Sequence, residues 1–215
     1  MIDYKKEFIS FALDCGVLKF GEFQLKSGRI SPYFFNTGLF NTGARLGTLS
    51  EFYAQALIHS GLNPVILYGP AYKGIPLACA TAVSYARITG NDIPYAFNRK
   101  ETKDHGEGGA IVGNSLSGKV LIIDDVITAG TSVRESVGII LQAGAEPMGV
   151  LIALDRQEKA QGQLSAVQEV MENYKIPVLS IISMNDIIDH IKSAASKGLE
   201  GHLDAIMAYQ DKYGV

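Results

Sequence analysis

The sequence predicts a single-domain α/β protein built on a Rossmann-like, doubly wound parallel sheet. Between residues 65 and 182, short apolar runs alternate with helix-like segments, and strands separated by helices of roughly 10–15 residues pair in parallel. The 215 residues are 47% hydrophobic and 19% charged, which is enough to bury a core and too apolar for a disordered chain. Sheets of this kind bind ligands at the carboxyl ends of their strands, so functional residues are expected there.

Two helices and a pair of short strands are predicted before the alternating region. The first helix is amphipathic, because Phe8, Phe11 and Ala12 stand at helical spacing. A glycine-punctuated stretch separates it from a second helix, which Thr42 can cap and Gly61 ends. In chain order these elements are helix 3–14, strands 23–25 and 33–36, and a helix from Thr42 to His59.

The alternating region contains five predicted strands, and the connecting helices lie between them. The strands are residues 65–68, 94–98, 120–123, 150–154 and 178–182. The helices are residues 74–88, 131–142 and 166–174. A polar, glycine-rich stretch over residues 99–118 is predicted to be a loop, and the tail from 185 to 213 is predicted to be helical.

Charge and cysteine content narrow the class of protein. The net charge of −3 disfavours a nucleic-acid-binding protein, which usually carries a basic excess. No apolar run approaches the ~18 residues of a membrane span, and acidic residues interrupt the N-terminus where a signal peptide needs an apolar stretch. Cys15 and Cys79 are expected to be free thiols. These features indicate a cytoplasmic protein with no nucleic-acid or membrane partner.

The most informative segment is residues 120–132, a buried strand followed by two acids and a small-residue loop. Asp124 and Asp125 end the strand, and the loop opens the next helix, whose unpaired N–H groups suit a phosphate. Gly130 allows close approach of the backbone, and hydroxyls can add donors. Two carboxylates beside a phosphate site can accept hydrogen bonds from a sugar diol, so the segment predicts a phosphorylated ribose ligand. The alternative is that Asp125 is a helix-entry acid and the threonines are caps.

A second glycine motif lies just upstream, over residues 113–119, and matches the nucleotide-binding pattern G-x-x-x-x-G-K. Val120 stands where that pattern needs a Ser or Thr for magnesium. The motif also precedes a strand, whereas a P-loop follows one. It is therefore rejected, and Lys119 is expected to be a solvated lysine.

Residues 120–132 resemble the phosphoribosyl-pyrophosphate (PRPP) motif of type I phosphoribosyltransferases. Three further stretches, residues 25–36, 68–76 and 97–108, resemble the orotate phosphoribosyltransferase family in particular. The resemblance covers nearly the whole chain, and only the part after about residue 185 is weakly diagnostic.

The resemblance implies transfer of ribosyl 5-phosphate from PRPP to orotate, giving orotidine 5′-monophosphate and pyrophosphate in de novo pyrimidine biosynthesis. It implies a PRPP-binding core over residues 65–182, an N-terminal hood formed mainly by residues 1–64, and C-terminal helices over 183–215. It also implies Mg²⁺ as cofactor, held mainly by PRPP and water with no direct protein ligand. A homodimer with shared active sites is expected.

The resemblance also assigns roles to individual residues. The expected catalytic residues are Lys73, Lys103, His105, Asp124 and Asp125. Contacts to PRPP are expected from Lys26, Tyr72, Lys73, Arg99, Lys100, Lys103, His105, Asp124, Asp125, Val126, Ile127, Thr128, Ala129, Gly130, Thr131 and Ser132. Contacts to orotate are expected from Phe34, Phe35, Thr128 and Arg156. A cis peptide bond is expected before Tyr72.

Several of these residues have a plainer interpretation. The loop at 69–74 could be an ordinary Gly-Pro turn with an exposed lysine, and residues 99–109 could be a solvated loop rather than a catalytic lid. Phe34 and Phe35 could be core residues of a strand, and at least one must be, since neighbouring strand side chains face opposite ways. Arg156 could pair with Asp155 or Glu158.

Two other functions are compatible with a PRPP loop. A purine phosphoribosyltransferase would share that loop but not the segment from Lys26 to Asn36. A PRPP-sensing regulator would need an attached DNA- or partner-binding module, for which 215 residues leave little room.

Overall fold

A six-stranded sheet forms the centre of the computed structural model, which describes residues 3–25, 27–103, 109–193 and 198–215. The strand order is β5-β4-β3-β6-β7-β8, and neighbouring strands are parallel except for β4 and β5. The strands are β3 (Ile66–Gly69), β4 (Tyr95–Lys103), β5 (Gly109–Gly113), β6 (Lys119–Ile123), β7 (Glu146–Asp155) and β8 (Val178–Ser183). The predicted α/β class and the mainly parallel sheet are confirmed.

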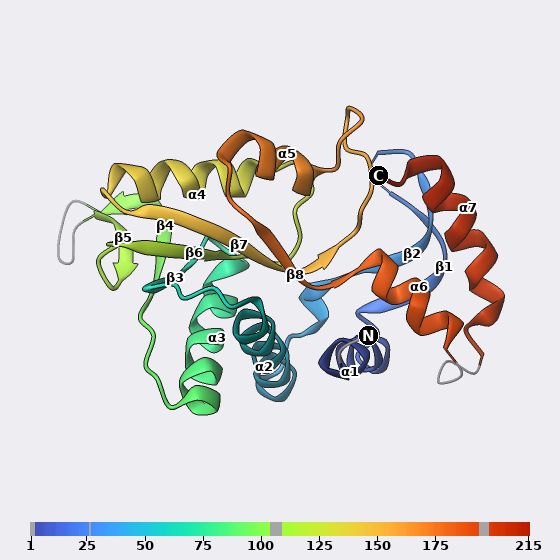
Figure 1. The fold of residues 1–215 in the computed structure, drawn as a ribbon, viewed down its shortest axis with the longest axis horizontal. Helices are drawn as coiled ribbons and strands as arrows, with labels where there is room; N and C mark the ends of the chain where they lie inside the picture. The colour runs from blue at the N-terminus through green and yellow to red at the C-terminus, as the bar shows by residue number, and fades with distance from the viewer. Residues whose placement is uncertain (1–2, 26, 104–108, 194–197) are drawn as a thin grey trace.

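Helices cover both faces of this sheet, as Figure 1 shows. One face carries α4 (Thr131–Gln142) and α5 (Ala166–Tyr174), and the opposite face carries α2 (Gly43–Ser60) and α3 (Gly74–Thr89). Each face has its own apolar cluster, and the strands contribute alternate side chains to the two clusters: Leu121 and Ile123 to one, Val120 and Ile122 to the other.

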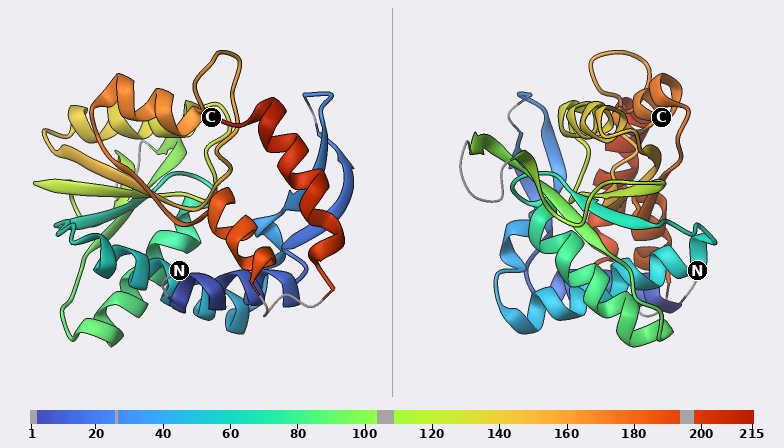
Figure 2. Two further views of the ribbon diagram at one scale, coloured as in Figure 1. Left: turned by 45° about the vertical axis from the view of Figure 1, so that its right-hand side comes forward. Right: turned by 90° about the vertical axis from the view of Figure 1, so that its left-hand side faces the viewer.

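The two ends of the chain meet beside the central sheet. Strands β1 (Leu18–Gln24) and β2 (Ile30–Phe35) form an antiparallel hairpin, and α7 (Leu203–Tyr213) packs on it (Figure 2). Helices α1 (Asp3–Asp14) and α6 (Met184–Lys192) also contact each other. Segments from opposite ends of the sequence therefore build one flank of the molecule.

Local signals explain where most helices begin and end. The Thr42 hydroxyl accepts a hydrogen bond from the Arg45 N–H, and Gly61 ends α2 in the left-handed conformation, as expected. Ser165 opens α5 with a capping box. Within the part of the chain that the structure describes, no helix is both long and apolar enough to cross a membrane.

The structure corrects two predicted elements. The stretch predicted as a loop, residues 99–118, contains the end of β4 and the whole of β5, because β5 adds to the sheet edge in the antiparallel direction. The apolar run in β5 is only three residues long and lies between two glycines, and the end of β4 is polar, so apolar periodicity did not reveal either of them. The predicted helical tail is two helices, α6 and α7, with a 3₁₀ turn (Glu200–His202) before α7.

Candidate active site

The carboxyl ends of β3 and β6 face a common pocket of about 370 Å³. It is lined by residues 70–73, which join β3 to α3, by residues 124–130, which join β6 to α4, and by the first residues of α4, 131–133. The pocket contains Tyr72, Lys73 and the whole predicted segment from Asp124 to Ser132. Its position at the strand ends is the one expected for an open parallel sheet.

Asp124 is a buried carboxylate at the end of β6. One oxygen accepts from the Asp125 N–H at 2.9 Å, and the other accepts from the Ser132 hydroxyl at 2.8 Å. Burial raises the pKa of Asp124 from 3.8 to about 6, against the lowering effect of these hydrogen bonds. Behind it, the hydroxyl of the fully buried Tyr53 donates to the Asp124 carbonyl at 2.7 Å. Asp124 is thus held firmly at the pocket wall.

Asp125 forms an ion pair across the pocket. Its Oδ2 lies 2.7 Å from Lys73 Nζ, and the same oxygen accepts from the Thr37 hydroxyl at 2.7 Å. Thr37 belongs to a short 3₁₀ helix (Thr37–Leu39) that follows β2. Sequence reasoning missed Thr37, because it stands 88 positions from Asp125 and belongs to no motif.

The loop from Val126 to Gly130 leads into α4, whose N-terminus has no side-chain cap. Gly130 is the N-cap residue and has the left-handed φ of 66°, with no side chain to cap the helix. The first N–H groups of α4 therefore keep donors available for an anion, together with the hydroxyls of Thr128 and Thr131. The interpretation of the threonines as helix caps is not supported, since α4 has no side-chain cap.

The loop between β3 and α3 is tied to β4 by the side chain of Asn98. The Ala71–Tyr72 peptide bond is cis, as the resemblance implies. The Ala71 N–H donates to Asn98 Oδ1 at 2.8 Å, which ties this loop to β4. The Tyr72 side chain is exposed, and Lys100 Nζ lies 5.1 Å from the centre of its ring. Asn98, which sequence reasoning also missed, thus fixes the loop that presents Lys73.

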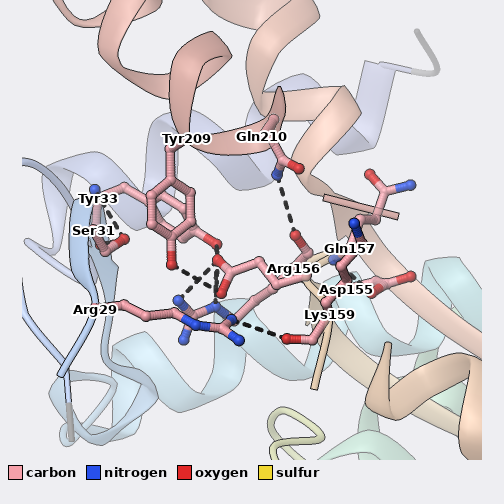
Figure 3. A network of polar contacts seen from close by, with 10 residues as sticks. Arg29, Ser31, Tyr33, Asp155, Arg156, Gln157, Lys159, Tyr209 and Gln210 are labelled. Atoms are coloured by element: carbon pink, nitrogen blue, oxygen red, sulfur yellow. Dashed lines mark hydrogen bonds and ion pairs between the residues drawn. The ribbon is translucent and has the colours of Figure 1, made fainter. Parts of the chain in front are cut away.

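The expected orotate contacts lie on β2 and on the loop after β7. Phe34 is exposed and stacks on Phe23 at 5.5 Å between ring centres, whereas Phe35 packs against the core. The guanidinium carbon of Arg156 lies 5.2 Å from the centre of the Tyr33 ring, so Arg156 approaches the strand that carries both phenylalanines (Figure 3). Arg156 also pairs with Glu158, at 2.9 Å, as the plainer interpretation expected. Phe34, Phe35 and Arg156 are not among the residues that line the 370 Å³ pocket.

The remaining predicted residues are only partly placed. Arg99 and Lys100 lie on β4, and Lys103 is its last residue. Lys26 and His105 lie outside the described residues.

Comparison with known proteins agrees with this geometry. Residues 41–178 match the family model described as the phosphoribosyl transferase domain. The orotate phosphoribosyltransferase of Methylococcus capsulatus is 60% identical, and the match covers 100% of this chain and 99% of that protein. This chain belongs to the orotate phosphoribosyltransferase family.

Other members of the orotate phosphoribosyltransferase family support the same assignment. The relative from Marinobacter nauticus is 60% identical, and the match covers the full length of both chains. The crystal structure of the Francisella tularensis enzyme superposes with a TM-score of 0.88 at 46% identity, covering 97% of this chain and 100% of that one. The fold expected from the resemblance to type I phosphoribosyltransferases is therefore confirmed.

Proposed function

We propose that the chain transfers ribosyl 5-phosphate from PRPP to orotate, giving orotidine 5′-monophosphate and pyrophosphate in pyrimidine biosynthesis. One observation carries the proposal: a pocket at the strand ends joins two carboxylates, a lysine and the open N-terminus of α4. That set matches a ribose diol, a diphosphate and a 5′-phosphate. Full-length identity of 60% to orotate phosphoribosyltransferases supports orotate as the acceptor base.

Each part of PRPP has a complementary part of the pocket. The 5′-phosphate is placed on the N–H groups and hydroxyls between Val126 and Ser132. The ribose hydroxyls donate to Asp124 and Asp125, and Lys73 meets the pyrophosphate. The bond from the anomeric carbon to pyrophosphate breaks while the bond to the orotate nitrogen forms, with positive charge developing on the ribose. Positioning and charge stabilisation suffice for this reaction without a protein nucleophile.

The ion pair between Lys73 and Asp125 fits these roles. The Lys73 side chain is 64% exposed, so it can leave Asp125 when a diphosphate enters the pocket. Asp125 is only 9% exposed and keeps its bond to Thr37, so it remains oriented toward the ribose. Lys73 can therefore leave the Asp125 carboxylate and pair with the diphosphate, while Asp125 stays in place.

Magnesium is proposed as the cofactor, held mainly by oxygens of PRPP and by water. Among the residues that the structure describes, no cluster of three or more His, Cys, Asp or Glu side chains could hold a metal ion. Asp124 and Asp125 are already engaged by Ser132, Thr37 and Lys73. This donor set fits a hydrated ion that takes its ligands from the substrate. Bound there, the ion makes the pyrophosphate a less basic leaving group.

The acceptor site is proposed to lie between β2 and the loop after β7. Phe34 and Phe35 would flank the pyrimidine, Thr128 would contact it from the phosphate loop, and Arg156 would pair with the orotate carboxylate. The planar guanidinium suits a carboxylate because it can donate two parallel hydrogen bonds.

A homodimer with shared sites is also proposed, in which Lys103 and His105 reach the neighbouring subunit's site. Its support is the presence of exposed apolar side chains on α3 and at the start of β4: Val83 and Ile88 are 58% and 48% exposed, and Tyr95 is 40% exposed.

Mixing two inactive variants tests the shared site. Asp125→Asn and Lys103→Ala would damage different halves of each site. Random reassociation makes half of the dimers hybrids with one complete site, so the mixture should recover about a quarter of the wild-type rate. A mixture as inactive as its parents would contradict site sharing.

A spectrophotometric assay tests the reaction itself. The fall in orotate absorbance is followed with PRPP and magnesium, and adenine, hypoxanthine and uracil serve as parallel acceptors. Orotate loss that requires PRPP is expected. Use of a purine instead would favour a purine phosphoribosyltransferase, and tight PRPP binding without turnover would favour a regulator.

We propose a cytoplasmic location as well. Cys15 and Cys79 are free thiols in the structure, as expected for a reducing compartment.

A further inference from the structure

Glu158 lies at the centre of a polar cluster behind the proposed orotate site. Its side chain is only 10% exposed. One carboxylate oxygen accepts from the Tyr33 hydroxyl and from Arg156, and the other accepts from the Tyr209 hydroxyl at 3.2 Å. Figure 3 shows Tyr33 and Tyr209 converging on Arg156 from β2 and α7. Three elements far apart in the sequence thus meet at one carboxylate.

Arg156 uses only one edge of its guanidinium in this cluster. Nε lies 3.2 Å and Nη2 2.9 Å from the same Glu158 oxygen, and Nε also donates to the Tyr33 hydroxyl at 3.1 Å. Nη1 makes no hydrogen bond to any residue that the structure describes. The edge formed by Nη1 and Nη2 is thus available, and the side chain is 31% exposed. A second carboxylate fits that edge through two parallel hydrogen bonds.

The loop that carries both residues is held on two sides. The Arg156 carbonyl accepts from Gln210 Nε2 at 3.3 Å, and the Lys159 N–H donates to the Tyr213 carbonyl at 2.8 Å. From the hairpin, Arg29 donates to the Lys159 carbonyl at 2.9 Å. The backbone is therefore fixed by the C-terminal helix and the N-terminal hairpin, which leaves the Arg156 side-chain torsions to be fixed by Glu158.

We propose that Glu158 is a positioning residue for acceptor recognition, which holds one edge of Arg156 so that the opposite edge meets the substrate carboxylate. The inference rests on the proposed role of Arg156 toward orotate. Tyr33 and Tyr209 direct both of their hydroxyls at Glu158, so α7 takes part in recognition without touching the substrate. A buried carboxylate with this many donors holds one geometry, because any other would leave polar groups unpaired.

The first test is kinetic and uses Glu158→Gln, with Glu172→Gln on the exposed surface of α5 as the matched control. Loss of the charge weakens the hold on Arg156, so the KM for orotate should rise roughly tenfold. The KM for PRPP should change less than about twofold, because the PRPP pocket shares no contact with Glu158. The control should match the wild type in both constants.

Tyr209→Phe provides a second variant that keeps the charge and the ring. It removes a single hydroxyl from Glu158, so the KM for orotate should rise by about threefold to fivefold, with PRPP unaffected. Should Glu158→Gln fail to fold, this variant still decides the question. Unchanged orotate KM in a folded Tyr209→Phe, or an equal rise for PRPP, would overturn the inference.

A double-mutant cycle separates this inference from the proposed function. In an Arg156→Ala background, Glu158→Gln should have no further effect on the KM for orotate, since Glu158 acts through Arg156. If Arg156→Ala alone leaves that KM unchanged, the proposed orotate contact is wrong. If Arg156→Ala raises the KM for orotate but Glu158→Gln in the wild-type background leaves it unchanged, the orotate contact stands and only the positioning role of Glu158 is wrong.

Discussion

At the scale of the residue, burial decides the chemistry of Asp124. The pKa of this carboxyl is raised to about 6, so it is fully charged, and able to accept from ribose hydroxyls, only above that pH. An acid with a higher pKa in the folded protein than in the unfolded chain lowers stability as pH rises through that interval. The loss of folding stability caused by Asp124 begins near pH 4, is complete above about pH 6, and is then constant.

Asp124→Asn is therefore expected to stabilise the fold while it abolishes most turnover. The shift from 3.8 to about 6 corresponds to an upper limit of about 3 kcal/mol in the free energy of unfolding at pH 8. At pH 5 the gain should be roughly half as large, because the native wild-type carboxyl is then mostly protonated. Urea denaturation of both proteins at the two pH values measures this. If Asp124→Asn and the wild type differed in free energy of unfolding by the same amount at pH 5 and at pH 8, the explanation by burial of Asp124 would be contradicted.

At the scale of the element, two glycines allow β3 and α3 to meet backbone to backbone. A Cβ on Gly69 would stand 2.2 Å from the Gly74 carbonyl oxygen, and a Cβ on Gly74 would stand 2.8 Å from the Ile123 carbonyl oxygen. Neither position has room for a methyl group. This close approach fixes the ends of the loop that carries Lys73.

Gly69→Ala should therefore displace that loop. We expect a loss of more than about 2 kcal/mol in the free energy of unfolding, since backbone cannot move aside as a flexible side chain can, and a strong fall in kcat/KM for PRPP. Gly47→Ala is the matched control: Gly47 lies inside α2 with open space around it, so alanine should stabilise by about 0.5–1 kcal/mol. Similar behaviour of the two variants would contradict the close-contact explanation.

At the scale of the whole molecule, the last helix is part of the core. Ile206 on α7 is fully buried in the apolar cluster that also holds Phe8 and Val17 from the first residues of the chain. The same helix carries Tyr209 and Gln210 to the loop of Arg156. The two ends of the chain thus stabilise one another and the proposed orotate site.

Ile206→Ala should destabilise the protein by about 2–5 kcal/mol, although it lies close to the C-terminus. The neighbouring Met207, which is 36% exposed, provides the control, and Met207→Ala should cost under about 1 kcal/mol. Chemical denaturation followed by fluorescence and circular dichroism measures both. A small effect of Ile206→Ala would mean that α7 is not integral to the fold.

Much of the fold and of the phosphate site could be predicted from residues that are neighbours in sequence. The helices predicted at 131–142 and 166–174 are α4 and α5, and the other core strands and helices were found with displaced ends. The Asp124–Ser132 segment forms one pocket wall because a strand end, a loop and a helix start are continuous in the chain. The edge strand β5 was missed, because its identity depends on pairing with β4 and not on its own apolar pattern.

The sequence by itself determined the α/β class, the phosphate loop and the family, since each is written in local pattern and composition. Only the tertiary structure decided that Thr37 and Lys73 share one oxygen of Asp125, and that Tyr33, Arg156 and Tyr209 gather around Glu158. Four of these five contacts join residues that lie between 51 and 125 positions apart in the sequence. In the fifth contact, Arg156 and Glu158 are two positions apart. Such contacts arise when the sheet and the two chain ends pack together, a step that no local pattern records.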